Sequence, residues 1–395
     1  MKSQTLFTPE QELLLCCART RFSDLYSNRV EQLVKNGLDW ETVIELAETH
    51  KLTQLLYKNL GSHCPDSLPV ERLQQLQKIY NTKVQYILFL TGELVSLVKE
   101  FNSREIPILP YKGPVLASQI YGNLAFRPYI DLDILVPVED VTRAKDLLLE
   151  RGYQITWPEL LLNPAQEKLH IRTKYNYQFI HPDKQVTLEL HWDVSPNYFS
   201  FPSDIGWLWQ DLTTISLGGA ELLAFPVEKL LLILCVHGGN HLWDRVGWIC
   251  DISELISRYS ALDWDVTFKD AAGFGVQRLL LIGLSLASQL LDAPIPEDIL
   301  RKIEADAEVK KLTQNMIERF ASFRWSGSGF LDIPLYHLRS RERVRDKLNY
   351  CLQMTTPTVK DLSFLTLPDG LNFFYYLIRP VRLAVEYGLG PLLKR

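Results

Sequence analysis

Two aspartates interrupt the apolar stretch Ile130-Asp131-Leu132-Asp133-Ile134-Leu135-Val136. The stretch has the length and the composition of a β-strand. Because residues two apart on a strand point to the same face, Asp131 and Asp133 share one face, roughly 6–7 Å apart along a backbone that rises ~3.3 Å per residue. Two like charges beside apolar neighbours need a counter-ion, and a divalent metal ion is a natural partner. The alternative is that the pair caps the strand or binds an arginine at a turn.

Most other segments of strand composition lie close to this one. They are residues 106–109, 153–157, 177–180 and 186–192. Residues 113–121 and 138–150 between them have helical spacing, and the second segment has acidic residues at its start and Gly152 after its end. We therefore predict an α+β fold whose α/β-type core is a small mixed β-sheet.

Helical spacing of apolar residues characterises both ends of the chain. It runs from residue 9 to about 101, where Asp39 resembles a helix N-cap, and it returns after about residue 201. The clearest later helices are expected at 226–241, 246–259 and 277–291. The predicted organisation is a helical N-terminal region (1–101), an α/β core (102–200) and a helical C-terminal domain (201–395).

Composition and charge limit the class of partner. Hydrophobic residues make up 47% of the 395 residues and charged residues 23%, as in ordinary folded proteins. The 42 basic and 47 acidic residues give a net charge of −5, which does not attract a polyanion over a broad surface. We expect no broad nucleic-acid surface, whereas a small phosphorylated substrate needs only a few local cations.

Several features favour a cytoplasmic protein. The six cysteines include no CxxC pair and several lie in apolar segments, as buried thiols do in a reducing compartment. Residues 1–5 lack the pattern of a signal peptide. The aromatic stretch 371–393 contains charges and a proline, so we expect no transmembrane segment there. Instead we expect an amphipathic helix packed on the protein body, with a membrane-surface helix as the alternative.

Other polar residues extend the candidate metal site. Glu189 lies between leucines in another expected strand, where it would supply a third carboxylate for one or two Mg²⁺ ions. Asp193 is the alternative third carboxylate. His191 would share the strand face of Glu189 and could orient it, but an ordinary hydrogen-bonded histidine is the favoured interpretation, and we leave His191 out of the catalytic residues.

Two cations lie near the acidic strand. Lys112-Gly113 occupies an expected strand-to-helix junction, where glycine permits close backbone approach and a helix N-terminus favours an anion. An ordinary helix start is the alternative. Arg127 directly precedes the strand, and its guanidinium suits phosphate oxygens, although it could instead pair with Asp131.

A histidine pair marks the C-terminal region. His237 and His241 are four residues apart, a spacing that can bind zinc from one helix face. The residues between them include two glycines and no glutamate, which argues against a zinc hydrolase and predicts a break in the helix. From the residues alone, His237, His241 and Trp243 could simply pack in the core. Asp251 is either a functional acid or a buried hydrogen-bonding anchor.

These motifs together resemble a known family. Lys112-Gly113-Pro114, Tyr121-Gly122, Arg127-Pro128 and the stretch 130–136 are similar to the uncharacterised bacterial nucleotidyltransferase family of the DNA polymerase β-like superfamily, and the likeness extends over roughly residues 9–290. The resemblance implies a nucleotidyltransferase core in which Gly113, Asp131 and Asp133 match the motif, with Glu189 as the third acid. The chain departs from the superfamily pattern in three respects: Pro114 replaces a small serine or glycine, the spacing to Asp131 is longer than the commonest pattern, and the third acid is a glutamate.

The resemblance implies an enzyme that uses Mg²⁺, or alternatively Mn²⁺. It would transfer a nucleoside monophosphate from a nucleoside triphosphate (NTP) to a hydroxyl of a small molecule, a protein or RNA, and release pyrophosphate. Asp131 and Asp133 would bind the metal, Glu189 would act as a ligand or general base, and Lys112 and Arg127 would steer the triphosphate. The resemblance also makes the segment from His237 to Trp243 a candidate wall of the nucleotide or acceptor pocket, with Trp243 available for base stacking, and core packing is the alternative. Because of Pro114 and Glu189, a nucleotide-binding or protein-interaction module without turnover is the alternative to an active enzyme.

Overall fold

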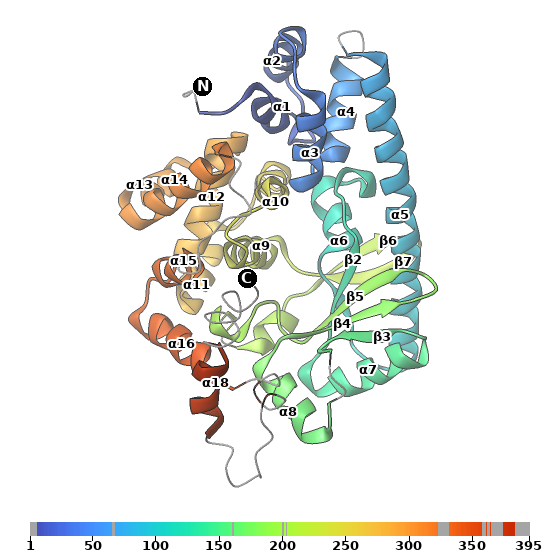
Figure 1. Cartoon of the computed structure of the whole chain (residues 1–395), viewed down its shortest axis with the longest axis vertical. Coiled ribbons are helices and arrows are strands. Elements are labelled where there is room, and N and C mark those ends of the chain that lie inside the picture. The colour runs from blue at the N-terminus through green and yellow to red at the C-terminus, as the bar shows by residue number, and fades with distance from the viewer. Residues whose placement is uncertain are drawn as a thin grey trace, which may run out of the picture.

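The computed structural model describes residues 6–64, 68–159, 162–199, 201–202, 204–322, 332–357, 361, 364 and 374–383. Helices from both ends of the chain lie on one side of a five-stranded sheet, and the long helix α5 (Val70–Ser103) runs past the other side (Figure 1). The expected α+β fold with a small mixed sheet is confirmed.

The central sheet has the order β1-β2-β5-β4-β3. Its strands are β1 (Leu109–Pro110), β2 (Asp131–Leu135), β3 (Gln154–Trp157), β4 (Asn176–His181) and β5 (Val186–His191). β2 and β5 are parallel, whereas the other neighbouring pairs are antiparallel. All five strands were expected, but β1 is shorter than predicted and ends at a proline, which lacks the N–H that a longer ladder needs.

Short helices connect the strands. They are α6 (Gly113–Leu116), which continues as a π-helix (Ala117–Tyr121), a 3₁₀ turn (Val138–Asp140) followed by α7 (Val141–Glu150), and α8 (Pro164–Thr173). The sequence analysis missed α8. Its start nevertheless carries a local signal, because Asn163 caps the backbone N–H of Gln166 and the Gln166 side chain returns a bond to the cap.

A second β-structure lies in the region that we expected to be helical. The hairpin of β6 (Thr213–Leu217) and β7 (Ala220–Ala224) turns at Gly218 and Gly219, which both have positive φ. Two glycines between alternating apolar residues are a typical hairpin signal. The buried residues of the hairpin join the hydrophobic cluster of the central sheet, so this part of the chain belongs physically to the sheet.

The remaining helices come from both ends of the chain. They are α1 (Pro9–Cys17), α2 (Asp24–Lys35), α3 (Trp40–Thr49), α4 (Thr53–His63), α9 (Val227–Asn240), α10 (Val246–Arg258), α11 (Trp264–Phe274), α12 (Gln277–Leu291), α13 (Glu297–Ala305), α14 (Ala307–Ala321), α15 (Asp332–Arg339), α16 (Val344–Thr355) and α18 (Tyr375–Leu383). The expected helices 226–241, 246–259 and 277–291 are confirmed as α9, α10 and α12. Asp39 caps α3, as expected.

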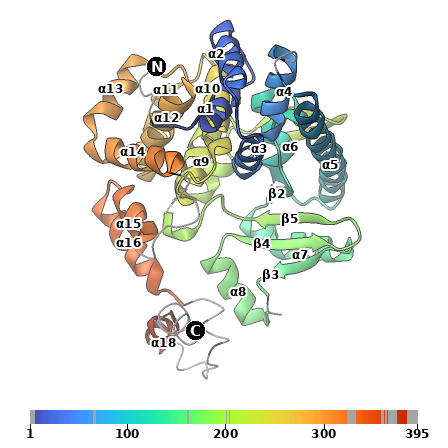
Figure 2. The same cartoon turned by 45° about the horizontal axis from the view of Figure 1, so that its top comes forward.

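The helices of the two ends share one hydrophobic core. Buried side chains of α1, α3 and α4 belong to the same cluster as those of α9, α10 and α12. Figure 2 shows α1 close to α10 and α12. Polar contacts join the ends as well, since the Gln11 side chain donates to the carbonyl of Phe320 at 2.7 Å and the Thr20 N–H donates to Glu254 at 2.8 Å.

The long helix α5 joins this helical core to the sheet. Its buried residues near the C-terminal end recur at Leu90, Leu94, Leu97 and Phe101, which is the spacing of one helix face. These side chains pack in the cluster that contains the apolar face of the sheet, whereas Leu76 near the other end packs in the helical core. One element therefore sets the distance and angle between the two cores.

Thiols and apolar segments agree in part with the sequence analysis. Five of the six cysteines are buried free thiols, and Cys351 is exposed. No helix in the described parts of the chain is long and apolar enough to cross a membrane. Of the aromatic stretch 371–393, residues 374–383 are described and form α18, whereas 371–373 and 384–395 lie outside the described residues.

The expected helix break at Gly238-Gly239 is wrong, because α9 continues to Asn240. The glycines serve close packing instead. A Cβ at Gly238 would lie 2.3 Å from the Trp243 ring, and one at Gly239 would lie 2.5 Å from Leu279. Tertiary contact therefore outweighs the helix propensity of these two residues.

Gly238→Ala should destabilise the protein by about 1–3 kcal/mol, because the added methyl group overpacks against the indole of Trp243. Gly273→Ala is the matched control. Gly273 is an exposed helical glycine, and no neighbouring group lies within 4 Å of the place that a methyl group would occupy. Alanine there should be neutral or should gain up to about 1 kcal/mol. Urea unfolding measures both free energies, and equal stability of the two variants would contradict the packing role.

His50 gives the stability a defined pH dependence. Its ring is fully buried, and Nδ1 accepts a bond from the Val246 N–H at 3.4 Å. Burial, assisted by the charge of Arg245, lowers the pKa of His50 to about 4. The unfolded chain has a histidine pKa of about 6.5. The stabilising contribution is therefore fully present above pH 6.5 and is lost as the pH falls toward 4.

His50→Asn removes this titration and keeps a side-chain acceptor. Between about pH 6 and pH 5 the wild type should lose up to about 1.4 kcal/mol of unfolding free energy per pH unit more than the variant does. Urea unfolding at a series of pH values measures the difference, in which contributions from other titrating groups cancel. A difference that does not change with pH would show that His50 has the same pKa in the folded protein as in the unfolded chain.

Candidate active site

The register of the strands builds a polar patch on one face of the sheet. Asp133 of β2 lies beside Glu189 of β5 in the parallel pair, and Glu189 lies beside Gln178 of β4 on its other side. Two residues further along β5, His191 lies beside Asn176 of β4. The opposite face carries the leucines, isoleucine and aromatic rings of the apolar cluster. Alternation along three strands therefore separates a polar face from an apolar one.

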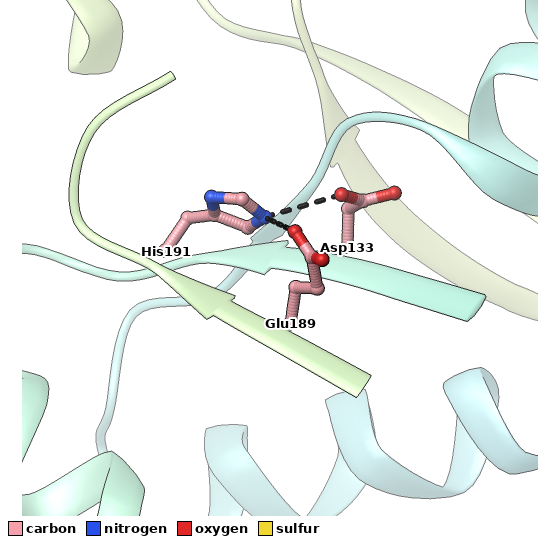
Figure 3. A group of neighbouring side chains, drawn as sticks. All are labelled: Asp133, Glu189 and His191. Atoms are coloured by element: carbon pink, nitrogen blue, oxygen red, sulfur yellow. Dashed lines mark hydrogen bonds and ion pairs between the residues drawn. The ribbon is translucent and has the colours of Figure 1, made fainter. Parts of the chain in front are cut away.

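Three side chains of this patch converge. The Nε2 of His191 lies 3.1 Å from Oδ1 of Asp133 and 3.0 Å from Oε2 of Glu189 (Figure 3). Among the described residues, these three form the group of potential ligands whose atoms all lie within 4.8 Å of one another. His191, which the sequence analysis left out of the site, is therefore part of it.

The charges in this group support one another. Burial by itself would raise the pKa of Asp133, but Lys112 and His191 outweigh it and hold the pKa below its usual range. Burial also opposes ionisation of Glu189, yet the hydrogen bond from His191 prevails and lowers the pKa. For His191, burial disfavours the imidazolium, but the two carboxylates outweigh burial and raise the pKa. Both carboxylates are therefore ionised near neutral pH.

Asp131 lies beside this group and differs from it. It lines the same cavity but does not belong to the set of converging ligand atoms. Burial, followed by the negative charge of Asp133, raises the pKa of Asp131 to about 6. The expected triad of Asp131, Asp133 and Glu189 is thus brought to one cavity, while the closest group contains His191 in place of Asp131.

Two amides hold the third carboxylate. The side chain of Gln178 donates to Oε1 of Glu189 at 2.9 Å, and that of Asn176 donates to Oε2 at 3.2 Å. Both come from β4, whose antiparallel pairing with β5 places them there. Asp193, the alternative third acid, lies past the end of β5, outside the converging group. The structure therefore brings Glu189 to Asp133.

Lys112 and Gly113 lie at the edge of the patch. The Nζ of Lys112 is 3.0 Å from Oδ1 of Asp133, and Lys112 is the N-cap of α6. Gly113 has φ +53°, a left-handed conformation that glycine adopts without strain. Both residues line the cavity, and the ammonium of Lys112 neutralises Asp133 directly.

Arg127 is held by Asp251 and not by Asp131. Its Nε and Nη2 donate to the two carboxylate oxygens of Asp251 at 2.9 and 3.0 Å, and the Tyr121 hydroxyl donates to Asp251 at 2.7 Å. The ion pair is nearly buried. Of the two interpretations of Asp251, the geometry shows the hydrogen-bonding anchor, which joins α10 to the segment before β2.

Asp251→Ala should lower the unfolding free energy by about 3–5 kcal/mol, because it leaves the guanidinium of Arg127 buried without its partner. Tyr121→Phe removes one hydrogen bond from the same carboxylate and should cost only about 1 kcal/mol. Urea unfolding of the two variants gives the comparison. If Asp251→Ala is no less stable than Tyr121→Phe, the anchor role is wrong.

A cavity of about 640 Å³ opens over the polar patch. Its walls come from α4 and α5, from the edge of the sheet, and from α9 and α10. His237 and His241 line it, and both rings pack against Trp248 at centroid distances of 5.0 Å. The zinc hydrolase is not favoured, since neither histidine is part of a convergent ligand group in the described chain.

Of the two interpretations of Trp243, core packing agrees with the structure and base stacking in the pocket does not. Its side chain is fully buried, packs on Gly238 and donates to the Tyr336 hydroxyl at 3.1 Å. The tryptophan that lines the cavity is Trp248 of α10. Sequence spacing alone did not distinguish the two tryptophans, because the turn between α9 and α10 decides which one points inward.

A second cavity of about 430 Å³ adjoins the first. The two share Tyr175, Gln178, Pro196, Asn240 and His241 along their common wall. Because Gln178 also binds Glu189, the shared wall lies next to the carboxylates. The second cavity therefore borders the wall that carries the carboxylates.

Comparison with known proteins agrees with this architecture. Residues 36–292, more than half of the chain, match the family model described as "Uncharacterised nucleotidyltransferase". The matched range contains the whole sheet, the polar patch and the walls of the cavity from α4 to α10. The chain therefore belongs to this nucleotidyltransferase family.

Comparisons with individual proteins are less informative than the match to the family model. No curated protein matches the chain. Among solved structures, an antigenic nucleotidyltransferase-like protein from Paracoccidioides brasiliensis is similar, with 17% sequence identity and a TM-score of 0.35; the match covers 54% of this chain and 96% of that one.

Proposed function

We propose that this protein transfers a nucleoside monophosphate from an NTP to a hydroxyl group of an acceptor and releases pyrophosphate, with the help of a divalent cation. The observation that carries the proposal is the in-register pairing of β2 and β5, which sets Asp133 beside Glu189 in a chain of a nucleotidyltransferase family. The net charge of −5 and the limited volume of the cavity favour a small-molecule or protein acceptor over long nucleic acid.

The side chains of the patch fit a divalent cation. Two ionised carboxylates and one imidazole nitrogen converge, and carboxylates suit Mg²⁺ and Mn²⁺. Asp133, Glu189 and Asp131 would hold the ion, with His191 as a direct ligand or as the group that orients the two nearest carboxylates. When bound, the ion neutralises phosphate oxygens and activates the attacking hydroxyl.

The other side chains would position the substrate. Asn176 and Gln178 hold Glu189 in one orientation, so that it can act as a ligand or accept the proton of the acceptor hydroxyl. Lys112 can move from Asp133 to a phosphate oxygen when a cation takes its place. Arg127 donates two hydrogen bonds to Asp251. Its role would therefore be to shape the wall of the cavity and to contribute positive charge.

Calorimetry with Mn²⁺ or Mg²⁺ and each NTP tests the site. Asp133→Asn and Glu189→Gln should each weaken cation-dependent NTP binding by on the order of 10-fold or more, because each removes a charged ligand. Asp146→Asn on the exposed side of α7 is the matched control and should bind as the wild type does. Pyrophosphate release from labelled NTP in cell extract measures turnover. Unchanged binding in both site variants would sink the metal-site proposal.

A nucleotide-binding module without turnover is the second candidate. One observation favours it: the same Asp133 oxygen is contacted by both Lys112 and His191, so the protein's own cations neutralise it. This candidate predicts NTP binding with no pyrophosphate release for any NTP. It also predicts that Asp133→Asn leaves NTP affinity unchanged.

A further inference from the structure

Three basic side chains in the cavity over the polar patch have no role in the proposed reaction. Lys51, Lys83 and Arg245 line the same cavity as the carboxylates. The two cations that the sequence analysis selected are already engaged, Lys112 by Asp133 and Arg127 by Asp251. The positive charge that remains available to a ligand therefore lies on the wall formed by α3, α5 and α10.

We propose that Lys51, Lys83 and Arg245 form an anion subsite for a polyphosphate chain, which in the proposed function is the β- and γ-phosphate end of the NTP. This inference deepens the proposed function and rests on it for the identity of the nucleotide. The anion subsite depends only on the three basic side chains. It can therefore be tested without a divalent metal ion and without nucleotide transfer.

A close backbone contact brings two of these cations together. Lys51 follows α3 with φ +61°, and Arg245 directly precedes α10. Between them, the N–H of Gly247 donates to the carbonyl of His50 at 3.0 Å. A Cβ at Gly247 would lie 2.7 Å from that carbonyl oxygen and 3.4 Å from the Cβ of Lys51, so only glycine permits this approach. The first turn of α10 is thus fixed against Lys51.

The third cation comes from α5. The Nζ of Lys83 lies 3.4 Å from the Glu48 carboxylate, and both side chains are partly exposed. Such pairs contribute only about 0–1 kcal/mol, so the ammonium is available to a more highly charged partner. The guanidinium of Arg245 lies 5.2 Å from the centre of the Trp248 ring, a cation–π contact between two residues that line the cavity.

Lys51 lies in the field of the other two cations and of the carboxylates of Glu48 and Asp131. Burial lowers the pKa of the Lys51 ammonium, and the like charges of Arg245 and Lys83 lower it further. Three cations that repel one another inside a cavity are stabilised by an anion. Asp244 also lines the cavity, but burial raises the pKa of its carboxyl and it forms no ion pair with Arg245 in the described structure.

The position of the cluster indicates a polyphosphate and not a single phosphate. The carboxylates occupy one wall of the cavity and the three cations another, and the charge of Asp131 reaches Lys51. A triphosphate can extend from a cation at the carboxylates to the basic wall. A monophosphate at the carboxylates would leave that wall empty, so the subsite would favour triphosphates over monophosphates.

Calorimetry with inorganic triphosphate and inorganic phosphate tests the subsite, with divalent ions removed by a chelator. The wild type should bind triphosphate at least about 10-fold more tightly than phosphate. Lys51→Asn and Arg245→Gln should each weaken triphosphate binding by on the order of 10-fold, since each removes a charge-assisted contact. Asparagine tolerates the left-handed backbone at Lys51, which protects the fold.

Lys99→Met is the matched control, because Lys99 is an exposed lysine on α5 away from the cavity. It should bind triphosphate as the wild type does, and thermal unfolding should confirm that all variants are folded. No preference of the wild type for triphosphate, or unchanged affinity in both Lys51→Asn and Arg245→Gln, would overturn the inference.

The failure of the subsite and the failure of the proposed function give different patterns. Asp133→Asn removes a negative charge. It should therefore not weaken the binding of triphosphate that is measured in the presence of the chelator. If triphosphate binds at the basic wall but no NTP is turned over, the subsite stands and the transferase proposal fails. If NTP is turned over but Lys51→Asn and Arg245→Gln have wild-type KM for NTP and wild-type triphosphate affinity, the subsite fails alone.

Discussion

The parallel pairing of β2 with β5 is the constraint on which the rest of the site depends. In this register Asp133 lies opposite Glu189, and period-two alternation then places Asp131 and His191 on the same face. A shift of one residue would turn these side chains into the apolar cluster and expose the leucines instead. The apolar face of the sheet, packed against α5, therefore selects the register that creates the polar patch.

The polar patch is stable because its charges compensate one another. Burial would oppose every ionised group, but Lys112 contacts Asp133, His191 contacts both carboxylates, and these contacts keep Asp133 and Glu189 ionised. The amides of β4 add orientation without charge. The buried charges are therefore paired and hydrogen-bonded, as charges in a protein interior need to be.

The helices around the sheet supply the remaining walls of the cavity over the polar patch. The helical core joins the two ends of the chain, and α9 and α10 complete a cavity that neither the sheet nor the N-terminal helices enclose alone. Glycines at 238, 239 and 247 make this possible, because each stands where another group approaches too closely for a Cβ. Residues distant in sequence, such as Lys51 and Arg245, meet only as a result of that packing.

The sequence by itself determined the fold class, the strands of the central sheet, the main helices of the C-terminal region and the acidic residues of the patch. Those features depend on local periodicity and on short motifs, which a single chain displays directly. Tertiary structure decided that His191 joins the ligands, that Asp251 holds Arg127, and that Trp248 instead of Trp243 faces the cavity. It also decided the β6–β7 hairpin's place beside the sheet. The physical reason is that ion pairing and burial depend on which elements pack together, and spacing along the chain does not specify those neighbours.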